Sequence, residues 1–172
     1  MKGRILTLIV VALLITVGGL AYLNQKQLTH TDQNSENPSV MIKADGEETG
    51  VITLEEIKAL GEVEFVTTLR SSGKPPSDHT YKGVPLKEVI LAVDKTLLEQ
   101  GEQVTAQAVD GYVVAYTVEE VMESEHIYLV YQQEGEPLKS KNEGGSGPFL
   151  VLARQDEFGQ RWCKFTVEIN IQ

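Results

Sequence analysis

Asp110, Gly111 and Tyr112 stand in succession along the chain, and their side chains suit a binding site. The aspartate carboxylate accepts hydrogen bonds from a polar ligand, and the tyrosine adds an aromatic face and a hydroxyl beside it. Runs of β-favouring residues flank the triplet between Val104 and Tyr116. An Asp-Gly pair between two such runs predicts a β-hairpin, because both residues tolerate the positive φ of its turn. These residues are therefore either part of a binding site or only a structural turn.

Other residue types that carry chemistry are scattered. His30, His79 and His126 show no metal-ligand spacing, and we predict no metal site from them. The glycine-rich run 144–147 lacks the lysine and the following helix of a phosphate-binding loop. The sequence contains no Gly-x-Ser-x-Gly nucleophile elbow and no recognisable Ser/His/Asp arrangement. We therefore assign no catalytic residue.

The single cysteine, Cys163, excludes an intramolecular disulfide. It lies in residues 161–171, where alternation of apolar and polar residues predicts one continuous strand. Cys163 shares the apolar face with Phe165, and we predict a core position for it, because buried free cysteines behave as small hydrophobic residues. Trp162 and Lys164 fall on the opposite face, where a ligand can contact them.

Short helices and strands are predicted to position these residues. Capping boxes at residues 53–56 and 117–120 predict two short helices. Apolar residues at helical spacing predict a third helix over 86–93, with Pro85 as its first residue. Strands are predicted near Met41 and over residues 63–69, 127–133, 148–153 and 161–171, and loops over 70–80 and 139–147. Strands punctuated by short helices, without regular alternation, indicate an α+β fold with a mixed, largely antiparallel sheet.

The N-terminal part of the chain predicts a location. Residues 5–23 form a run without charge, and a helix of that length just spans a hydrocarbon core of about 30 Å. Lys2 and Arg4 precede the run, which predicts that the following part of the chain lies outside the cytoplasm. Two alternatives remain: residues 1–26 are an uncleaved signal anchor, which the length favours, or a secretory signal peptide cut near residues 19–21. The domain is therefore expected to be membrane-anchored or secreted.

Composition divides the rest of the chain into a tether and a domain. Residues 27–48 are polar, show no apolar period and predict a flexible tether. Residues 49–172 are long enough for one domain with its own core. Residues 1–26 hold three of the 15 basic residues and none of the 25 acidic ones, so residues 27–172 carry a net charge of −13. A surface this negative argues against binding nucleic acid through a basic patch.

Several short motifs occur in a fixed order along the chain. They are Tyr81–Leu86, Asp110–Tyr112, Gly135–Leu138, Gly147–Pro148 and Trp162–Phe165. In this order the set resembles the molybdopterin-binding domain of sulfite-oxidase-type oxidoreductases, over about residues 51–171. The resemblance implies a sulfite-oxidase-like fold, a molybdopterin cofactor and oxygen transfer to or from a small substrate. It also implies that Asp110, Gly111, Tyr112 and Lys164 contact the cofactor, together with the loop that holds Ser71 and Ser72.

The sequence departs from this family at two positions that matter for chemistry. The loop that would supply a cysteine thiolate to molybdenum, residues 67–73, has Ser71 and Ser72 and no cysteine. A thiolate is a soft, charged ligand, whereas a serine hydroxyl is hard and essentially neutral at pH 7. Leu150 stands where the family often has an arginine, whose fork suits oxyanions.

These departures leave two functions in competition. The first is a non-redox module that binds a small polar ligand or a membrane-associated protein partner near Asp110 and Tyr112. The alternative is a molybdopterin-dependent oxidoreductase whose metal is held by Ser71 or Ser72. Whether any cofactor is kept is left open by the sequence.

Overall fold

The protein is described here as a computed structural model, which covers residues 37–70, 73 and 75–172. Its strands are β1 (Ser39–Ala44), β2 (Glu47–Thr53), β3 (Val63–Leu69), β4 (Ser77–Pro85), β5 (Gln103–Ala108), β6 (Val113–Thr117), β7 (Ile127–Gln133), β8 (Glu136–Pro137), β9 (Leu150–Ala153), β10 (Cys163–Lys164) and β11 (Thr166–Ile171). Its helices are α2 (Leu54–Lys58), α3 (Leu86–Val93), α4 (Leu97–Gln100) and α5 (Val118–Met122), with 3-10 turns η1 (Lys141–Glu143) and η2 (Gly159–Arg161). The predicted α+β class is confirmed.

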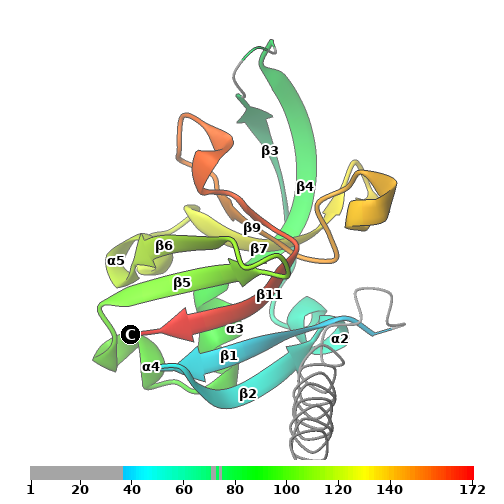
Figure 1. Cartoon of the computed structure of the whole chain (residues 1–172). Coiled ribbons are helices and arrows are strands. Elements are labelled where there is room, and N and C mark those ends of the chain that lie inside the picture. Colours follow the sequence, from blue (N-terminus) through cyan, green and yellow to red (C-terminus); the bar gives the residue numbers. More distant parts are fainter. Residues whose placement is uncertain (1–36, 71–72, 74) are drawn as a thin grey trace, which may run out of the picture. The chain divides into compact units, whose positions relative to one another are not determined.

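The strands form two sheets (Figure 1). Sheet 1 has the order β2-β1-β11-β5-β6, and only its β1–β11 pair is parallel. Sheet 2 has the order β10-β9-β7-β4-β3, with β8 added on β7, and is antiparallel throughout. The β3–β4 hairpin projects beyond the other strands of sheet 2 (Figure 1).

Helix α3 connects the cores of the two sheets. Its Leu86, Val89 and Ile90 are fully buried, and the helix contacts β2 of sheet 1 as well as β4 and β7 of sheet 2. Strands β7 and β9 of sheet 2 are buried along most of their length, which explains why their sequences are continuous apolar runs rather than alternating ones.

The predicted local signals at the helix starts are confirmed. Both capping boxes form: the Glu56 backbone N–H donates to Thr53 Oγ1 at 3.4 Å, and the Glu120 backbone N–H donates to Thr117 Oγ1 at 3.1 Å. Each glutamate side chain accepts in return from the backbone N–H of its threonine at 2.8 Å. Pro85 precedes α3 as its N-cap residue and ends β4, one position earlier than predicted.

Two predicted boundaries are wrong. Strand β1 and the start of β2 lie within residues 27–48, the range predicted to be a tether, because Val40 and Ile42 are buried in sheet 1. The strand predicted near Met41 is confirmed as β1, and the tether prediction applies only to residues before Ser39. The predicted loop 70–80 is also too long, since β4 begins at Ser77 and pairs with β3 from there onward.

The apolar run 5–23 and the rest of residues 1–36 lie outside the described residues. The anchor and the signal peptide therefore stay predictions. Within the described part of the chain, no helix has the length and apolar character needed to cross a bilayer.

Candidate functional site

The β5–β6 hairpin turns at Asp110 and Gly111, as the sequence predicts. Gly111 has φ +83°, a conformation that glycine adopts without a steric penalty. Two backbone hydrogen bonds close the turn, from Gly111 N–H to the Ala108 carbonyl at 2.9 Å and from Ala108 N–H to the Tyr112 carbonyl at 2.8 Å.

The predicted strand over residues 161–171 is interrupted at Phe165, and this break positions β10, which forms the second side of the site. Residues 161–171 were predicted as one strand, but the chain leaves sheet 2 after β10 and enters sheet 1 at β11. Phe165 lies between them with φ +58°, a rare conformation for a bulky residue. Backbone hydrogen bonds hold it there, from its N–H to the Ser146 carbonyl at 2.9 Å and from Val109 N–H to its carbonyl at 3.0 Å. The break therefore brings β10 against the Asp110 turn.

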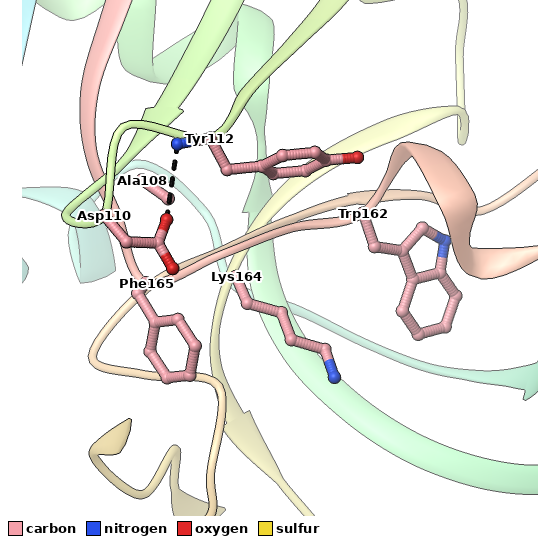
Figure 2. A pocket seen from close by; sticks show the side chains of 6 residues that line it. All are labelled: Ala108, Asp110, Tyr112, Trp162, Lys164 and Phe165. Atoms are coloured by element: carbon pink, nitrogen blue, oxygen red, sulfur yellow. Dashed lines mark hydrogen bonds between the residues drawn. The ribbon is translucent and has the colours of Figure 1, made fainter. Parts of the chain in front are cut away.

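A pocket of about 190 Å³ lies between the turn and β10 (Figure 2). Its lining residues are Ala108, Asp110, Tyr112, Trp162, Lys164 and Phe165. The structure thus brings together three of the predicted site residues, Asp110, Tyr112 and Lys164. Gly111 shapes the turn but does not line the pocket, and Ser71 and Ser72 lie outside the described residues.

The Asp110 carboxylate has two partners. Lys141 Nζ lies 2.9 Å from Oδ2, and the Tyr112 backbone N–H donates to Oδ1 at 3.3 Å, the bond drawn in Figure 2. The hydrogen bond from Lys141 is the main cause that lowers the pKa of Asp110 below its ordinary value, and the bond from Tyr112 adds to it. Asp110 is therefore ionised at neutral pH.

Lys141 is a site residue that the sequence did not predict. It belongs to η1 in the segment predicted as an unstructured loop, and its ammonium also lies 5.5 Å from the centre of the Phe165 ring. The capping box of Ser140 and Glu143 starts η1, and this Ser-x-x-Glu pattern was the available signal. Nothing local in the sequence links Lys141 to Asp110.

Two aromatic walls of the pocket are fixed by hydrogen bonds. The Tyr112 hydroxyl donates to the Gln160 carbonyl at 3.1 Å, although its ring is half exposed. The Trp162 indole N–H donates to the Ala153 carbonyl at 3.1 Å, and its ring packs edge-on against Tyr81 with centroids 5.8 Å apart. Hydrogen bonds within the protein therefore hold both walls in place.

Lys164 differs from Lys141 in having no counter-charge. Its side chain is exposed, and its ammonium makes no hydrogen bond or ion pair within residues 37–70, 73 and 75–172. In Figure 2 it extends from β10 between Phe165 and Trp162, directed away from Asp110. An unpaired ammonium at a pocket is available to an anionic group of a ligand.

Arg70, the described residue that precedes Ser71 in the sequence, contacts a turn beside this site. The Gly159 N–H donates to the Arg70 carbonyl at 3.5 Å, and the next residue, Gln160, accepts from Tyr112. The turn η2 therefore contacts both the last residue before the serines and a wall of the pocket.

Tyr81, whose ring packs against Trp162 of the pocket, allows a prediction about stability at alkaline pH. Burial, with a smaller contribution from the charge of Glu134, raises the pKa of Tyr81 from 10.0 to about 12. The neutral phenol is favoured in the folded state, so its stabilising contribution is present below pH 10 and is lost as the pH rises towards 12. We expect the free energy of unfolding to fall over this range, and to fall less in Tyr81→Phe. Equal losses in the two proteins would contradict this assignment.

Comparison with known proteins gives the family. The sequence profile of the oxidoreductase molybdopterin binding domain matches residues 27–172. The chain belongs to this family. Its fold is similar to the crystal structure of the sulfane dehydrogenase SoxCD from Paracoccus pantotrophus, with a TM-score of 0.61 and 17% sequence identity over 78% of this chain and 38% of that one. No curated protein matches the sequence.

At 17% identity the likeness to SoxCD shows the fold alone. This member of the family also spans well under half of the length of the SoxCD chain. The fold is that of the molybdopterin-binding domain, and the chemistry of the pocket depends on the residues of this chain.

Those residues do not fit a molybdenum ion held by a thiolate. Cys163 is fully buried, and its Sγ lies 3.5 Å from the Ala106 carbonyl in the core of the domain. Burial raises the pKa of its thiol, so it stays protonated at neutral pH. Among the described residues, no group of three or more His, Cys, Asp and Glu side chains is placed to hold a metal. The predicted core role of Cys163 agrees with its position.

Proposed function

We propose that this member of the molybdopterin-binding-domain family is a non-redox module that binds a small polar ligand at Asp110, Tyr112 and Lys164. The observation that carries the proposal is that Cys163, the single cysteine of the chain, is fully buried in the core and is not among the residues that line the pocket. The loop that begins after Arg70 offers serine hydroxyls instead of a thiolate. In the family that this chain resembles, the metal is held by a cysteine thiolate, a soft and charged ligand that a neutral serine hydroxyl does not replace in kind.

The pocket itself supports a small ligand. Its volume of about 190 Å³ is below the roughly 300–1,000 Å³ of sites for drug-sized ligands. It combines aromatic walls with a carboxylate and an ammonium, which is the usual composition of a site that fixes the orientation of a ligand.

We further propose that residues 5–23 anchor the domain to a membrane, with residues 37–172 outside the cytoplasm. The support is the uncharged run and the basic residues Lys2 and Arg4 before it. A membrane-associated protein partner is compatible with this placement. Cleavage near residues 19–21 would instead release a secreted protein.

The molybdenum content of the purified full chain tests the non-redox role. We expect protein made in a host that synthesises molybdopterin to contain no molybdenum above the buffer blank, by mass spectrometry, and no pterin by fluorescence after oxidation. The control is a molybdenum enzyme purified from the same culture.

Stoichiometric molybdenum would overturn the proposal. In that case a variant carrying both Ser71→Ala and Ser72→Ala identifies the ligand. Loss of the metal from this variant would establish the alternative, an oxidoreductase with serine ligation.

A further inference from the structure

We infer that the ligand of this pocket is a small zwitterion, which carries an ammonium and a carboxylate on one compact body, as an α-amino acid does. The inference rests on the proposed binding function and names the class of ligand. Three features of the described residues carry it: the ion pair of Asp110, the aromatic walls and the unpaired Lys164.

The first feature is that Asp110 already binds an ammonium. Lys141 Nζ lies 2.9 Å from its Oδ2, the length of a charge-assisted hydrogen bond. The ammonium reaches Asp110 from η1, a separate segment of the chain, rather than from β5 or β6. The geometry therefore shows what the carboxylate accepts: a primary ammonium that approaches from the side of η1.

The second feature is the aromatic surroundings of that ammonium. Lys141 Nζ lies 5.5 Å from the centre of the Phe165 ring, within the range of a cation–π contact. Tyr112 and Trp162 supply two more rings around the pocket that Asp110 and Phe165 also line (Figure 2). A carboxylate beside aromatic faces is a combination that recognises organic ammonium groups.

The Lys141 contact is easy to replace. Both side chains of the pair are about half exposed, at 53% for Lys141 and 44% for Asp110, and exposed ion pairs contribute little to stability. Gly144, three residues after Lys141, ends η1 in the left-handed conformation at φ +74°. Lys141 therefore acts as a resident substitute for the ammonium of the ligand, and the ligand displaces it.

The third feature is the opposite charge of Lys164. Lys164 lines the same pocket, and its ammonium lacks a counter-charge within the described residues and is directed away from Asp110 (Figure 2). A ligand with a positive group alone would leave Lys164 unpaired, and a ligand with a negative group alone would leave Lys141 on Asp110. A zwitterion pairs with both Asp110 and Lys164.

Three related probes test this inference on the full chain in detergent, by isothermal titration calorimetry. They are L-phenylalanine, phenethylamine, which lacks the carboxylate, and 3-phenylpropionate, which lacks the ammonium. We expect L-phenylalanine to bind at least about tenfold more tightly than either of the other two, because each loses one charge-assisted contact.

The decisive variant is Lys141→Met, which removes the resident ammonium. We expect it to bind L-phenylalanine and phenethylamine about two- to fivefold more tightly than the unaltered protein. Lys139→Met removes the same charge from the same segment without touching the pocket, and should leave both affinities unchanged. Asp110→Asn should lose phenethylamine binding and weaken L-phenylalanine binding at least about tenfold.

The opposite pattern would overturn the inference. If 3-phenylpropionate or inorganic sulfate binds as tightly as L-phenylalanine, and Lys141→Met weakens that binding, the pocket takes anions through two lysines. Absence of binding by all probes at millimolar concentration also overturns it. Neither result restores a redox role, which only the molybdenum measurement decides, so the two proposals can fail separately.

Discussion

Gly83→Ala is expected to lower the free energy of unfolding by about 4 kcal/mol. Gly83 lies in β4 where that strand pairs with β7, at a shift of the register between Lys82 and Gly83. A Cβ atom on Gly83 would lie 2.4 Å from the Leu129 carbonyl oxygen and 2.8 Å from Val130 Cα. Both are backbone atoms in the centre of sheet 2, so the two strands would have to separate. Urea denaturation followed by circular dichroism measures the change.

Gly61→Ala is the matched control for this substitution. Gly61 has φ +98°, so alanine is strained there, but a Cβ would meet nothing within 4 Å. We expect Gly61→Ala to lower the free energy of unfolding by about 1 kcal/mol, which is the strain of the left-handed conformation alone. Similar losses in Gly83→Ala and Gly61→Ala would contradict the role given to strand contact. The requirement for close approach explains the glycine in the Tyr81–Leu86 motif.

Arg161→Ala is expected to lower the free energy of unfolding by about 2 kcal/mol, after allowance for partial exposure of the pair. The guanidinium of Arg161 donates to both carboxylate oxygens of Asp156, at 2.8 and 2.6 Å, and lies 2.8 Å from Glu120. The Asp156 side chain is only 16% exposed, so it would be left as a poorly solvated charge. Calorimetry and urea denaturation both report the loss.

Arg161 also supports the pocket. Its backbone carbonyl accepts a hydrogen bond from the Tyr116 hydroxyl. Of its neighbours, Gln160 accepts from the Tyr112 wall, and Trp162 is itself a wall of the pocket. We therefore expect Arg161→Ala to weaken ligand binding as well as folding.

Arg154→Ala is the control, because its ion pair with Glu125 is longer, at 3.5 Å, and Glu125 is 75% exposed. We expect a loss of about 1 kcal/mol or less for it, including its contact with the Phe65 ring. An equal or larger loss than in Arg161→Ala would contradict the network.

The pH dependence of the same network has a defined sign. The hydrogen bond from Arg161 is the main cause that lowers the pKa of Glu120. Glu120 therefore stabilises the fold above its ordinary pKa, and this contribution is lost as the pH falls through the lower folded-state value. The free energy of unfolding should therefore fall less at acidic pH in Arg161→Ala than in the unaltered protein. This result would link the loss of stability to the pair of Arg161 and Glu120.

Local signals were sufficient to predict much of the fold. The Asp110–Gly111 turn and the boxes at residues 53–56 and 117–120 depend on residues a few positions apart, and all of them form. The bounds of β3 and β7 were predicted from composition, because both strands are rich in β-branched and aromatic residues.

The strand boundaries that were predicted wrongly are those that depend on pairing with segments distant in the sequence. Apolar alternation extends through residues 161–171, yet Cys163 pairs with Val151 of sheet 2 and Thr166 pairs with Ala108 of sheet 1. The break at Phe165 follows from a change of partner, which alternation does not encode. The start of β4 at Ser77 likewise depends on β3, since its own composition favours a loop.

The residues of the candidate site also divide into those that the sequence predicted and those that depend on contacts between distant segments. Asp110, Tyr112 and Lys164 were predicted from their types and from the family resemblance, and the structure places them around one pocket. Lys141 was missed because its contact with Asp110 joins segments 31 residues apart. Ser71 and Ser72 remain predictions.

The position of β11 in sheet 1 has a consequence for synthesis of the protein. This strand, residues 166–171, lies between β1 and β5 and is the only link between the β1–β2 and β5–β6 pairs in that sheet. Without these residues, the facing edges of β1 and β5 have no partner strand in sheet 1. Closing sheet 1 then requires contact across nearly the whole domain, which slows folding and favours aggregation of incomplete chains. Sheet 1 is therefore expected to close late in folding, when residues 166–171 pair with both β1 and β5.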